Sequence, residues 1–335
     1  MNIRKKDGSI DVKRLLTESG LYLVLLLMLL LIIAKEPSFL SIRNFKNILT
    51  QSSVRAIIAL GVAGLIVTQG TDLSAGRQVG LAAVISATLL QASTNVNKVF
   101  PNMGEVPVIA AIIVVVLVGM VIGGINGFVV AKFNLHPFIV TMGMMTIVYG
   151  INSLYYDSVG ASPISGFSKS YSSFAQGNIL NISYLIFYAA IATVIMWILW
   201  NKTKFGKNLF AVGGNPEAAR VSGVNVTRTF IGIYALSGMY YAFGGLLEAG
   251  RIGSATNNLG NMYEMDAIAA CVIGGVSFYG GVGKISGVLT GVIILTIINY
   301  GLTYVGVSPY WQYIIKGLII VVAVAFDSIK YAKKK

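Results

Sequence analysis

Long apolar runs alternate with short polar segments over most of the chain. A transmembrane helix needs about 20 predominantly apolar residues, so the pattern predicts an all-α membrane protein with about ten transmembrane helices in a single domain, residues 1–335. Several runs are short, which is tolerated where protein or a cavity surrounds the backbone. The expected spans are 20–35, 54–69, 79–92, 107–131, 137–153, 184–200, 229–247, 265–277, 285–301 and 312–326.

The basic residues between the spans predict the orientation, because cytoplasmic loops collect Lys and Arg. With a cytoplasmic N-terminus, the inner segments are the tail 1–19, the loops 70–78, 132–136, 201–228 and 278–284, and the tail 327–335. They hold 17 of the 25 Lys and Arg residues. Both termini are therefore expected in the cytoplasm, and the loop 201–228 is the largest inner connection.

Composition excludes several classes of protein. Hydrophobic residues make up 56% of the chain and charged residues 11%, whereas a soluble domain carries roughly 25% charged residues. The net charge of +13 does not predict nucleic-acid binding, because the charges lie in separate loops. Single Cys and His residues do not predict a metal site. The first apolar run, Leu21–Ala34, resembles a signal peptide, but Lys35 follows it without a small-x-small cleavage site, which favours an uncleaved span.

Glycines mark two kinds of feature. Gly119, Gly123 and Gly127 form a doubled GxxxG pattern, which predicts close helix packing. The connections Gly70–Arg77 and Phe278–Lys284 are both Gly-rich and lie between short apolar runs, as at the pathway of many transporters; they are an internal repeat or a chance similarity.

The second Gly-rich connection does not match a phosphate-binding loop. Phe278 occupies the position of the first Walker glycine, and Ile285 occupies the position of the Ser or Thr that holds Mg²⁺. No ATP site is therefore expected on this chain. No catalytic constellation is expected either.

Asp72 is the most informative acid, and its role has two interpretations. It fastens a local turn through backbone N–H groups, or it contacts the transport pathway directly. Arg77 is its partner or a charge at the inner membrane surface. The candidate residues for a pathway or turn are Gly70, Thr71, Asp72, Ser74, Gly76 and Arg77.

A second polar cluster follows the seventh expected span on the outer side. It forms a solvated loop, a docking rim or the mouth of a pathway. Glu264 and Asp266 lie nearby in sequence. The candidate periplasmic mouth residues are Glu248, Arg251, Asn257 and Asn258. Three aromatic pairs are expected near outer membrane surfaces: Tyr155-Tyr156, Tyr240-Tyr241 and Tyr310-Trp311.

The loop 201–228 contains the signature of a short helix. Asn215 is a good N-cap, Pro216 suits the first helical position, and Glu217 complements the helix dipole. Gly223 can take the left-handed conformation that ends a helix. So short a helix is marginal alone, which predicts either a cytoplasmic partner that holds it or a position on the membrane surface.

This segment resembles the coupling loop of ATP-binding-cassette (ABC) importer permeases, in the ribose/galactose branch. That branch's Gly-Asn-x-x-Ala-Ala-x-x-Ser-Gly pattern is matched by Gly214-Asn215, Ala218-Ala219 and Ser222-Gly223. The segment Gly70–Gly76 is similar to the branch's Gly-Ile-Asp-Leu-Ser-x-Gly signature, with Thr71 in place of Ile. The ATPase-coupling residues implied by the resemblance are Gly214, Asn215, Pro216, Glu217, Ala218, Ala219, Arg220, Ser222 and Gly223.

Longer stretches resemble the galactose/methyl-galactoside subfamily. They include 68–78, 155–166, 248–258 and 308–313, within a similarity that runs from about residue 20 to the C-terminus. The resemblance implies a bacterial inner-membrane permease that works as two copies, with a periplasmic sugar-binding protein and a cytoplasmic ATPase of two nucleotide-binding halves. ATP and Mg²⁺ would bind the ATPase and no cofactor would bind this chain.

Two other classes are weighed against an ABC permease. An ion-coupled transporter is disfavoured because the centres of the expected spans nearly lack ionisable residues. A membrane-embedded enzyme is disfavoured because no set of catalytic residues is visible.

Overall fold

A computed structural model describes residues 25–332, most of which are helical. The longer helices are α2 (Ile42–Val67), α4 (Val108–Phe133), α5 (Pro137–Ser158), α7 (Tyr184–Lys202), α10 (Val226–Ile252), α12 (Ile285–Tyr304) and α13 (Pro309–Ala332). The shorter ones are Leu25–Lys35, the 3₁₀ helix η1 (Pro37–Phe39), α3 (Ala75–Leu89), α6 (Lys169–Gln176), α8 (Lys204–Gly214), α9 (Pro216–Val221) and α11 (Tyr263–Ile273).

Very short strands also occur within residues 25–332, which an all-α prediction did not include. β1 (Ile164–Ser165) pairs antiparallel with β4 (Ser254–Ala255), and β2 (Asn178–Ile179) pairs with β3 (Ile182–Ser183). The β1–β4 pair ties the connection after α5 to the connection after α10. These contacts link segments far apart in the sequence, so local periodicity could not reveal them.

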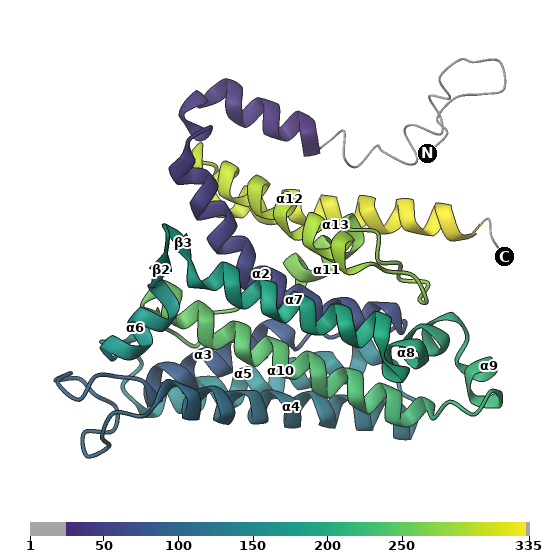
Figure 1. The fold of residues 1–335 in the computed structure, drawn as a ribbon, viewed down its shortest axis with the longest axis horizontal. Coiled ribbons are helices and arrows are strands. Elements are labelled where there is room, and N and C mark those ends of the chain that lie inside the picture. Colours follow the sequence, from purple (N-terminus) through teal and green to yellow (C-terminus); the bar gives the residue numbers. More distant parts are fainter. Residues whose placement is uncertain (1–24, 333–335) are drawn as a thin grey trace.

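The helices form one elongated bundle (Figure 1). α4, α7 and α10 run roughly parallel, with α8 and α9 at one end and α6 with the β2–β3 hairpin at the other (Figure 1). α13 ends near the α8–α9 end. It continues to Ala332, so the C-terminal tail expected from residue 327 begins inside this helix. The tail 1–19 lies outside the described residues.

Glycines hold α4 against α10, as the doubled GxxxG pattern predicted. A Cβ at Gly119 would overlap the Gly238 carbonyl oxygen, and one at Gly123 would overlap the Tyr234 carbonyl oxygen. At Gly127 a Cβ would lie only 2.8 Å from the Ile231 Cα. The two backbones therefore touch directly over about two turns, which only glycine permits.

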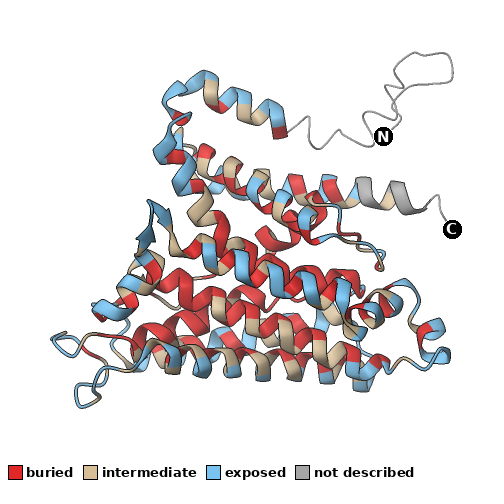
Figure 2. Ribbon diagram, viewed as in Figure 1, coloured by how far each residue is buried: buried red, intermediate tan, exposed pale blue. Residues whose placement is uncertain are grey.

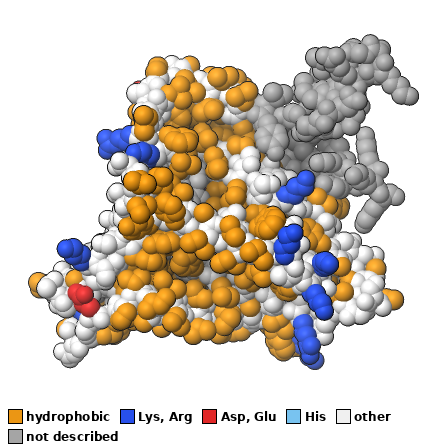
Figure 3. Space-filling view, in the orientation of Figure 1, with side chains coloured by type: hydrophobic (Ala, Val, Ile, Leu, Met, Phe, Trp, Pro, Cys, Tyr) orange, Lys and Arg blue, Asp and Glu red, His pale blue; other side chains and the backbone are white. Residues whose placement is uncertain are grey.

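Burial separates core helices from peripheral ones. α2, α3 and α10 are largely buried, while α4, α5 and α7 expose broad apolar faces (Figure 2). The surface in Figure 3 is apolar over its middle, with Lys and Arg toward the margins. Exposed apolar faces of this extent would be unfavourable in water and are expected against lipid.

Six helices in the described part of the chain are long and apolar enough to cross a membrane: α2, α4, α5, α7, α10 and α12. Each of the ten expected spans overlaps a helix, but α3 and α11 are shorter than a full crossing. The first helix is described only from Leu25 to Lys35. α3 ends at Leu89, and a non-helical connection leads from there to α4. α11 begins at Tyr263, eight residues after β4 ends at Ala255.

The expected aromatic pairs behave differently from one another. Tyr310 and Trp311 are strongly exposed at the start of α13, as a membrane-surface position requires. Tyr240 and Tyr241 are instead buried inside α10, and the Tyr240 hydroxyl donates to the Ala192 carbonyl oxygen at 2.9 Å. Their assignment to the membrane surface was therefore wrong, because tertiary packing and not sequence spacing decides which tyrosines are covered.

Candidate functional site

The short helix expected in the loop 201–228 is α9, and both of its caps are present. The Asn215 Oδ1 accepts a hydrogen bond from the Ala218 N–H at 3.0 Å, and Pro216 occupies the first helical position. At the other end Gly223 has φ +84°, its N–H donates to Arg220 O, and the Val224 N–H donates to Ala219 O. This double closure is a Schellman motif, which stabilises a six-residue helix.

The chain itself holds α9, contrary to the expectation that a partner or the membrane surface must do so. Ala219 is buried against Val212 of α8 and Val226 of α10. The sequence argument considered only the length of α9 and could not anticipate that α8 would lie beside it. A partner is therefore not needed to order the helix, and its remaining faces are available for docking.

The exposed face of α9 is mixed in character. Glu217 and Arg220 form an exposed ion pair at 3.0 Å, which contributes little to stability by itself. Val221 is 89% exposed although it is apolar. Gly214, Ala218, Ser222 and Gly223 are also exposed. An apolar side chain that makes no contact within its own chain, beside a charged pair, is typical of a surface that meets another protein.

The two Gly-rich connections meet beside the end of α8. The Gln69 Nε2 donates to the Gly213 carbonyl oxygen at 2.8 Å and to the Tyr279 carbonyl oxygen at 3.0 Å. The Gly281 N–H donates to the Val67 carbonyl oxygen at 2.8 Å. Gln69, directly before the first connection, thus bonds both the end of α8 and the second connection, whether or not the two connections are a true internal repeat.

Asp72 fastens the turn between α2 and α3. Its Oδ1 accepts the Ser74 N–H at 2.9 Å and the Ser74 hydroxyl at 2.5 Å. Ser74 Oγ in turn accepts from Gln78 Nε2 at 2.9 Å and from Asn126 Nδ2 at 3.1 Å. Burial raises the pKa of the Asp72 carboxyl to about 6, and the hydrogen bonds from Ser74 oppose that rise.

The other candidate turn residues support the same geometry. The Gly70 N–H closes the end of α2 by donating to the Leu65 carbonyl oxygen at 2.8 Å. The Thr71 carbonyl oxygen accepts the Tyr234 hydroxyl at 3.1 Å, which ties the turn to α10. Gly76 packs against Gly260 so closely that a Cβ would overlap its carbonyl oxygen.

Arg77 is not the partner of Asp72, which corrects one of the two interpretations of this residue. Its Nη2 donates to Asn261 Oδ1 at 2.8 Å, and its guanidinium lies 4.1 Å from the centre of the Tyr149 ring. Each residue turns an α-helix by about 100°, so the side chain of Arg77, near the start of α3, points away from the Asp72 turn. It joins the turn residues to the connection between α10 and α11.

The charged residues of the outer cluster do not form a solvated loop. Glu248 is 3% exposed, pairs with Arg251 at 2.8 Å, and accepts the Tyr263 hydroxyl at 2.6 Å. Asp266 is also buried and pairs with Lys316 at 2.8 Å and with Arg55. Arg55 and Lys316 were missed by sequence reasoning. Their signal was a basic residue inside the apolar part of each of two expected spans.

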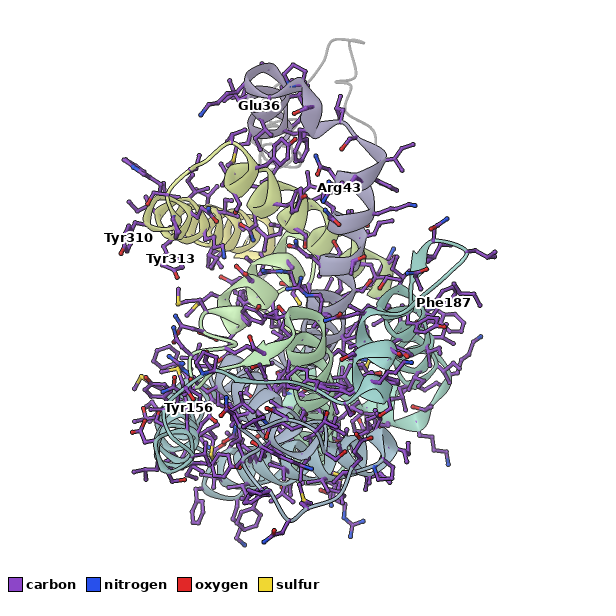
Figure 4. All side chains as sticks on the ribbon, turned by 90° about the vertical axis from the view of Figure 1, so that its left-hand side faces the viewer. Glu36, Arg43, Tyr156, Phe187, Tyr310 and Tyr313 are labelled. Atoms are coloured by element: carbon purple, nitrogen blue, oxygen red, sulfur yellow. The ribbon has the colours of Figure 1, made fainter. Side chains whose placement is uncertain are left out.

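The two asparagines of the expected mouth point to different places. Asn257 Nδ2 donates to Ser153 Oγ at 3.3 Å, on α5. Asn258 instead lines a cleft of about 370 Å³. The cleft is formed by Ile252, Ser254, Thr256, Asn258, Leu259, Gly260, Asn261, Tyr263 and Tyr313. Glu248 and Arg251 are outside this cleft. Figure 4 shows Tyr310 and Tyr313 on the same side of the molecule as Tyr156.

Within residues 25–332, no group of three or more His, Cys, Asp and Glu side chains could hold a metal ion. The lone Cys271 is fully buried in α11, where its thiol donates to the Ala59 carbonyl oxygen at 3.4 Å. It acts as a small packing residue.

Comparison with known proteins identifies the family. A family model described as "Branched-chain amino acid transport system / permease component" matches residues 44–324. Proteins named galactose/methyl galactoside import permease are 66% identical in Haemophilus influenzae, over all of both chains, and 68% identical in Escherichia coli, over 96% of both. A ribose import permease of Haemophilus influenzae is 35% identical over 99% of both chains. No solved structure matches the chain significantly.

The apolar bundle, with the short exposed helix α9 at one end, and these similarities define a multi-pass membrane permease. The chain belongs to the permease-component family of ABC importers, which its family model covers over most of its length. The prediction that it is a transport subunit, and not itself an enzyme, is confirmed by this membership.

Proposed function

We propose that this chain forms the pathway of a binding-protein-dependent importer for galactose, methyl galactoside or a related monosaccharide. The relatives named for galactose and methyl galactoside share about twice the identity of the ribose relative, 66% against 35%. The observation that carries the mechanism is α9, a doubly capped helix anchored by Ala219 with an outward face that nothing in the described chain covers.

The proposed assembly contains two copies of this chain in the inner membrane of a bacterium, surrounded by lipid. A cytoplasmic ATPase with two nucleotide-binding halves docks on α9 of each copy and binds ATP and Mg²⁺. A periplasmic sugar-binding protein delivers substrate at the opposite end. The bonds from Gln69 to Gly213 and Tyr279 support this arrangement, because they join the end of α8, which directly precedes α9, to the end of α2 and to the connection before α12.

Ten spans with both termini in the cytoplasm remain part of the proposal. The α11 helix crosses only part of the bilayer, and the turn-rich connection before it completes the crossing. Non-helical backbone at membrane depth is tolerated where protein covers it, and Gly260 packs on α3 in this way.

Membership of the ABC permease family excludes an ion-coupled transporter. The scarcity of ionisable residues in the expected spans does not exclude it. Asp266, Arg55 and Lys316 form a buried ionic group among α2, α11 and α13, so the bundle is not free of ionisable residues. Asp266 has two basic partners, which is typical of a structural ion pair.

The substitution Val221→Asp tests the docking role of α9. Val221 makes no contact that holds the chain together, so the variant permease is expected at normal levels in the membrane. Placing a carboxylate in an apolar protein interface is expected to weaken capture of the ATPase at least about tenfold. Co-purification of the ATPase and ATP-dependent galactose uptake in proteoliposomes are the measurements.

Val96→Asp is the matched control, because Val96 is 97% exposed in the connection between α3 and α4, at the other end of the molecule. It is expected to leave both measurements unchanged. Wild-type ATPase capture and uptake by the Val221→Asp protein would show that α9 is not the coupling element.

A further inference from the structure

The cleft beside α11 is built from a non-helical segment held by the backbone of α3. Residues 257–262 form consecutive turns between β4 and α11. A Cβ at Gly80 would overlap the Leu259 carbonyl oxygen, and Gly76 and Gly260 pack on each other. Interrupted helices of this kind line the substrate sites of many transporters. The segment is rigidly placed, so its polar side chains have defined positions.

The polar groups of this cleft have few partners within the chain. Among residues 25–332, no hydrogen bond forms at the side chains of Ser254, Thr256 or Asn258. Asn261 uses its Oδ1 to accept from Arg77, which leaves its Nδ2 as a donor. The cleft therefore presents hydroxyl and amide groups that can donate and accept hydrogen bonds.

Aromatic rings form the remaining walls. Tyr263 is fixed by its hydrogen bond to Glu248 at 2.6 Å. Tyr313 lies on α13, which the Lys316–Asp266 pair at 2.8 Å ties to α11 one turn further along. The buried ion pairs thus hold the two rings in place. An aromatic ring offers an apolar face that packs against the C–H face of a sugar ring.

The chemistry of the lining discriminates between ligands. None of the nine lining residues is charged, although the family description names branched-chain amino acids. An amino acid zwitterion carries two full charges and would need charged or dipolar partners on both. A neutral molecule with several hydroxyl groups needs only amides, hydroxyls and an apolar face. The volume of about 370 Å³ suits one small ligand.

We infer that this cleft is a monosaccharide-contacting site on the transport pathway, in which Asn258 and Asn261 hydrogen-bond sugar hydroxyls and Tyr313 packs on the ring. Arg77 is a positioning residue, because it orients the Asn261 amide without lining the cleft itself. This inference rests on the proposed function. It assigns the pathway's sugar contacts to a segment outside both Gly-rich connections.

The test uses the complete importer in proteoliposomes, with the variants Asn258→Ala and Tyr313→Ala. Neither side chain forms a hydrogen bond within the described chain, so folding and ATPase capture are expected to persist. Galactose uptake is expected to fall about tenfold or more, and the ratio of galactose to glucose uptake is expected to change. ATP hydrolysis stimulated by the binding protein is expected to continue, because it depends on docking rather than on sugar contact.

Tyr310→Ala and Asn102→Ala are the controls, since both residues are exposed and neither lines the cleft. Wild-type uptake and selectivity in both cleft variants would overturn the inference while leaving the importer intact. Loss of ATPase capture together with uptake would assign the two residues to structure and overturn it as well. Wild-type protein without ATP-dependent sugar uptake would overturn the proposed function itself, and the cleft with it.

Discussion

At the residue scale, a network of buried polar side chains holds the turn between α2 and α3 in place. Asp72, Ser74, Gln78 and Asn126 are all at most 2% exposed, and they bond to one another around the turn between α2 and α3. An unpaired polar group in such a place is costly, so each substitution there has a defined consequence.

Asp72→Asn is expected to be milder than Asp72→Leu. The Asn side chain retains an oxygen for the Ser74 N–H and hydroxyl, whereas Leu leaves both without an acceptor at a cost of about 1–3 kcal/mol. Membrane level, thermal unfolding in detergent and galactose uptake are the measurements. Equal and complete loss of uptake by both variants at normal protein level would instead favour a charge-dependent role in the pathway.

The same residue predicts a pH dependence. A carboxyl that releases its proton at about 3.9 when unfolded holds it to about 6 in the folded protein. The folded state therefore binds more protons between these values, and the contribution of Asp72 to stability falls as the pH rises through them. Asp72→Asn removes that contribution, so its unfolding temperature is expected to depend less on pH between 4 and 6.

Sequence reasoning identified the turn at Asp72 because a local rule governs it: a carboxylate can bond its own backbone two residues on. It left the partner of Arg77 open and did not anticipate the ion pair of Asp266, because the partners of these two residues lie far along the chain. Asp266 and Lys316 are fifty residues apart. No periodic pattern encodes such a pairing.

At the scale of the element, α9 shows how much a short segment can specify. Asn215, Pro216 and Gly223 each obey a local capping rule, so the helix could be predicted almost to the residue. The contacts that hold it in place could not be predicted, because the burial of Ala219 depends on the direction in which α8 leaves α7. Ala219→Glu therefore disrupts the anchoring of α9 within the chain and is a poor probe of docking.

Gly223→Val is expected to abolish transport, while Gly223→Asn retains most of it. The φ of +84° is unfavourable for a β-branched residue, but Asn adopts left-handed conformations more readily. No other atom lies within 4 Å of a Cβ at this position, so the difference reports backbone conformation and not steric overlap. ATPase co-purification and uptake are the measurements. Equal behaviour of the two variants would mean that the left-handed closure is not required.

At the scale of the whole molecule, the apolar pattern located the helices well and their ends poorly. The expected span 54–69 is the second half of α2, which begins at Ile42. The pattern excluded Arg43 and Lys46 because they are charged, although both lie in the helix. A helix can extend beyond the bilayer, so hydropathy marks the lipid-covered part and not the element.

The proposed topology predicts a labelling pattern for single cysteines introduced into a Cys271→Ala background. Cysteines at Asn102 and Asn178 are expected to react with an impermeant maleimide from outside intact cells. Cysteines at Lys204 and Lys334 are expected to react only after the membrane is opened. The reason is that α8 and the connection after α7 lie at the opposite end of the bundle from α6 and β2 (Figure 1). Reaction of Asn178 and Lys204 sites from the same side would contradict ten spans.

The contact between α4 and α10 restricts how this permease can change shape. Gly119, Gly123 and Gly127 have no side chains that could extend to fill a gap, so separating the two backbones would leave a void along about two turns. The pair must therefore travel as one rigid body when access alternates between the two sides of the membrane. The sliding surfaces have to lie elsewhere, where longer side chains can exchange neighbours.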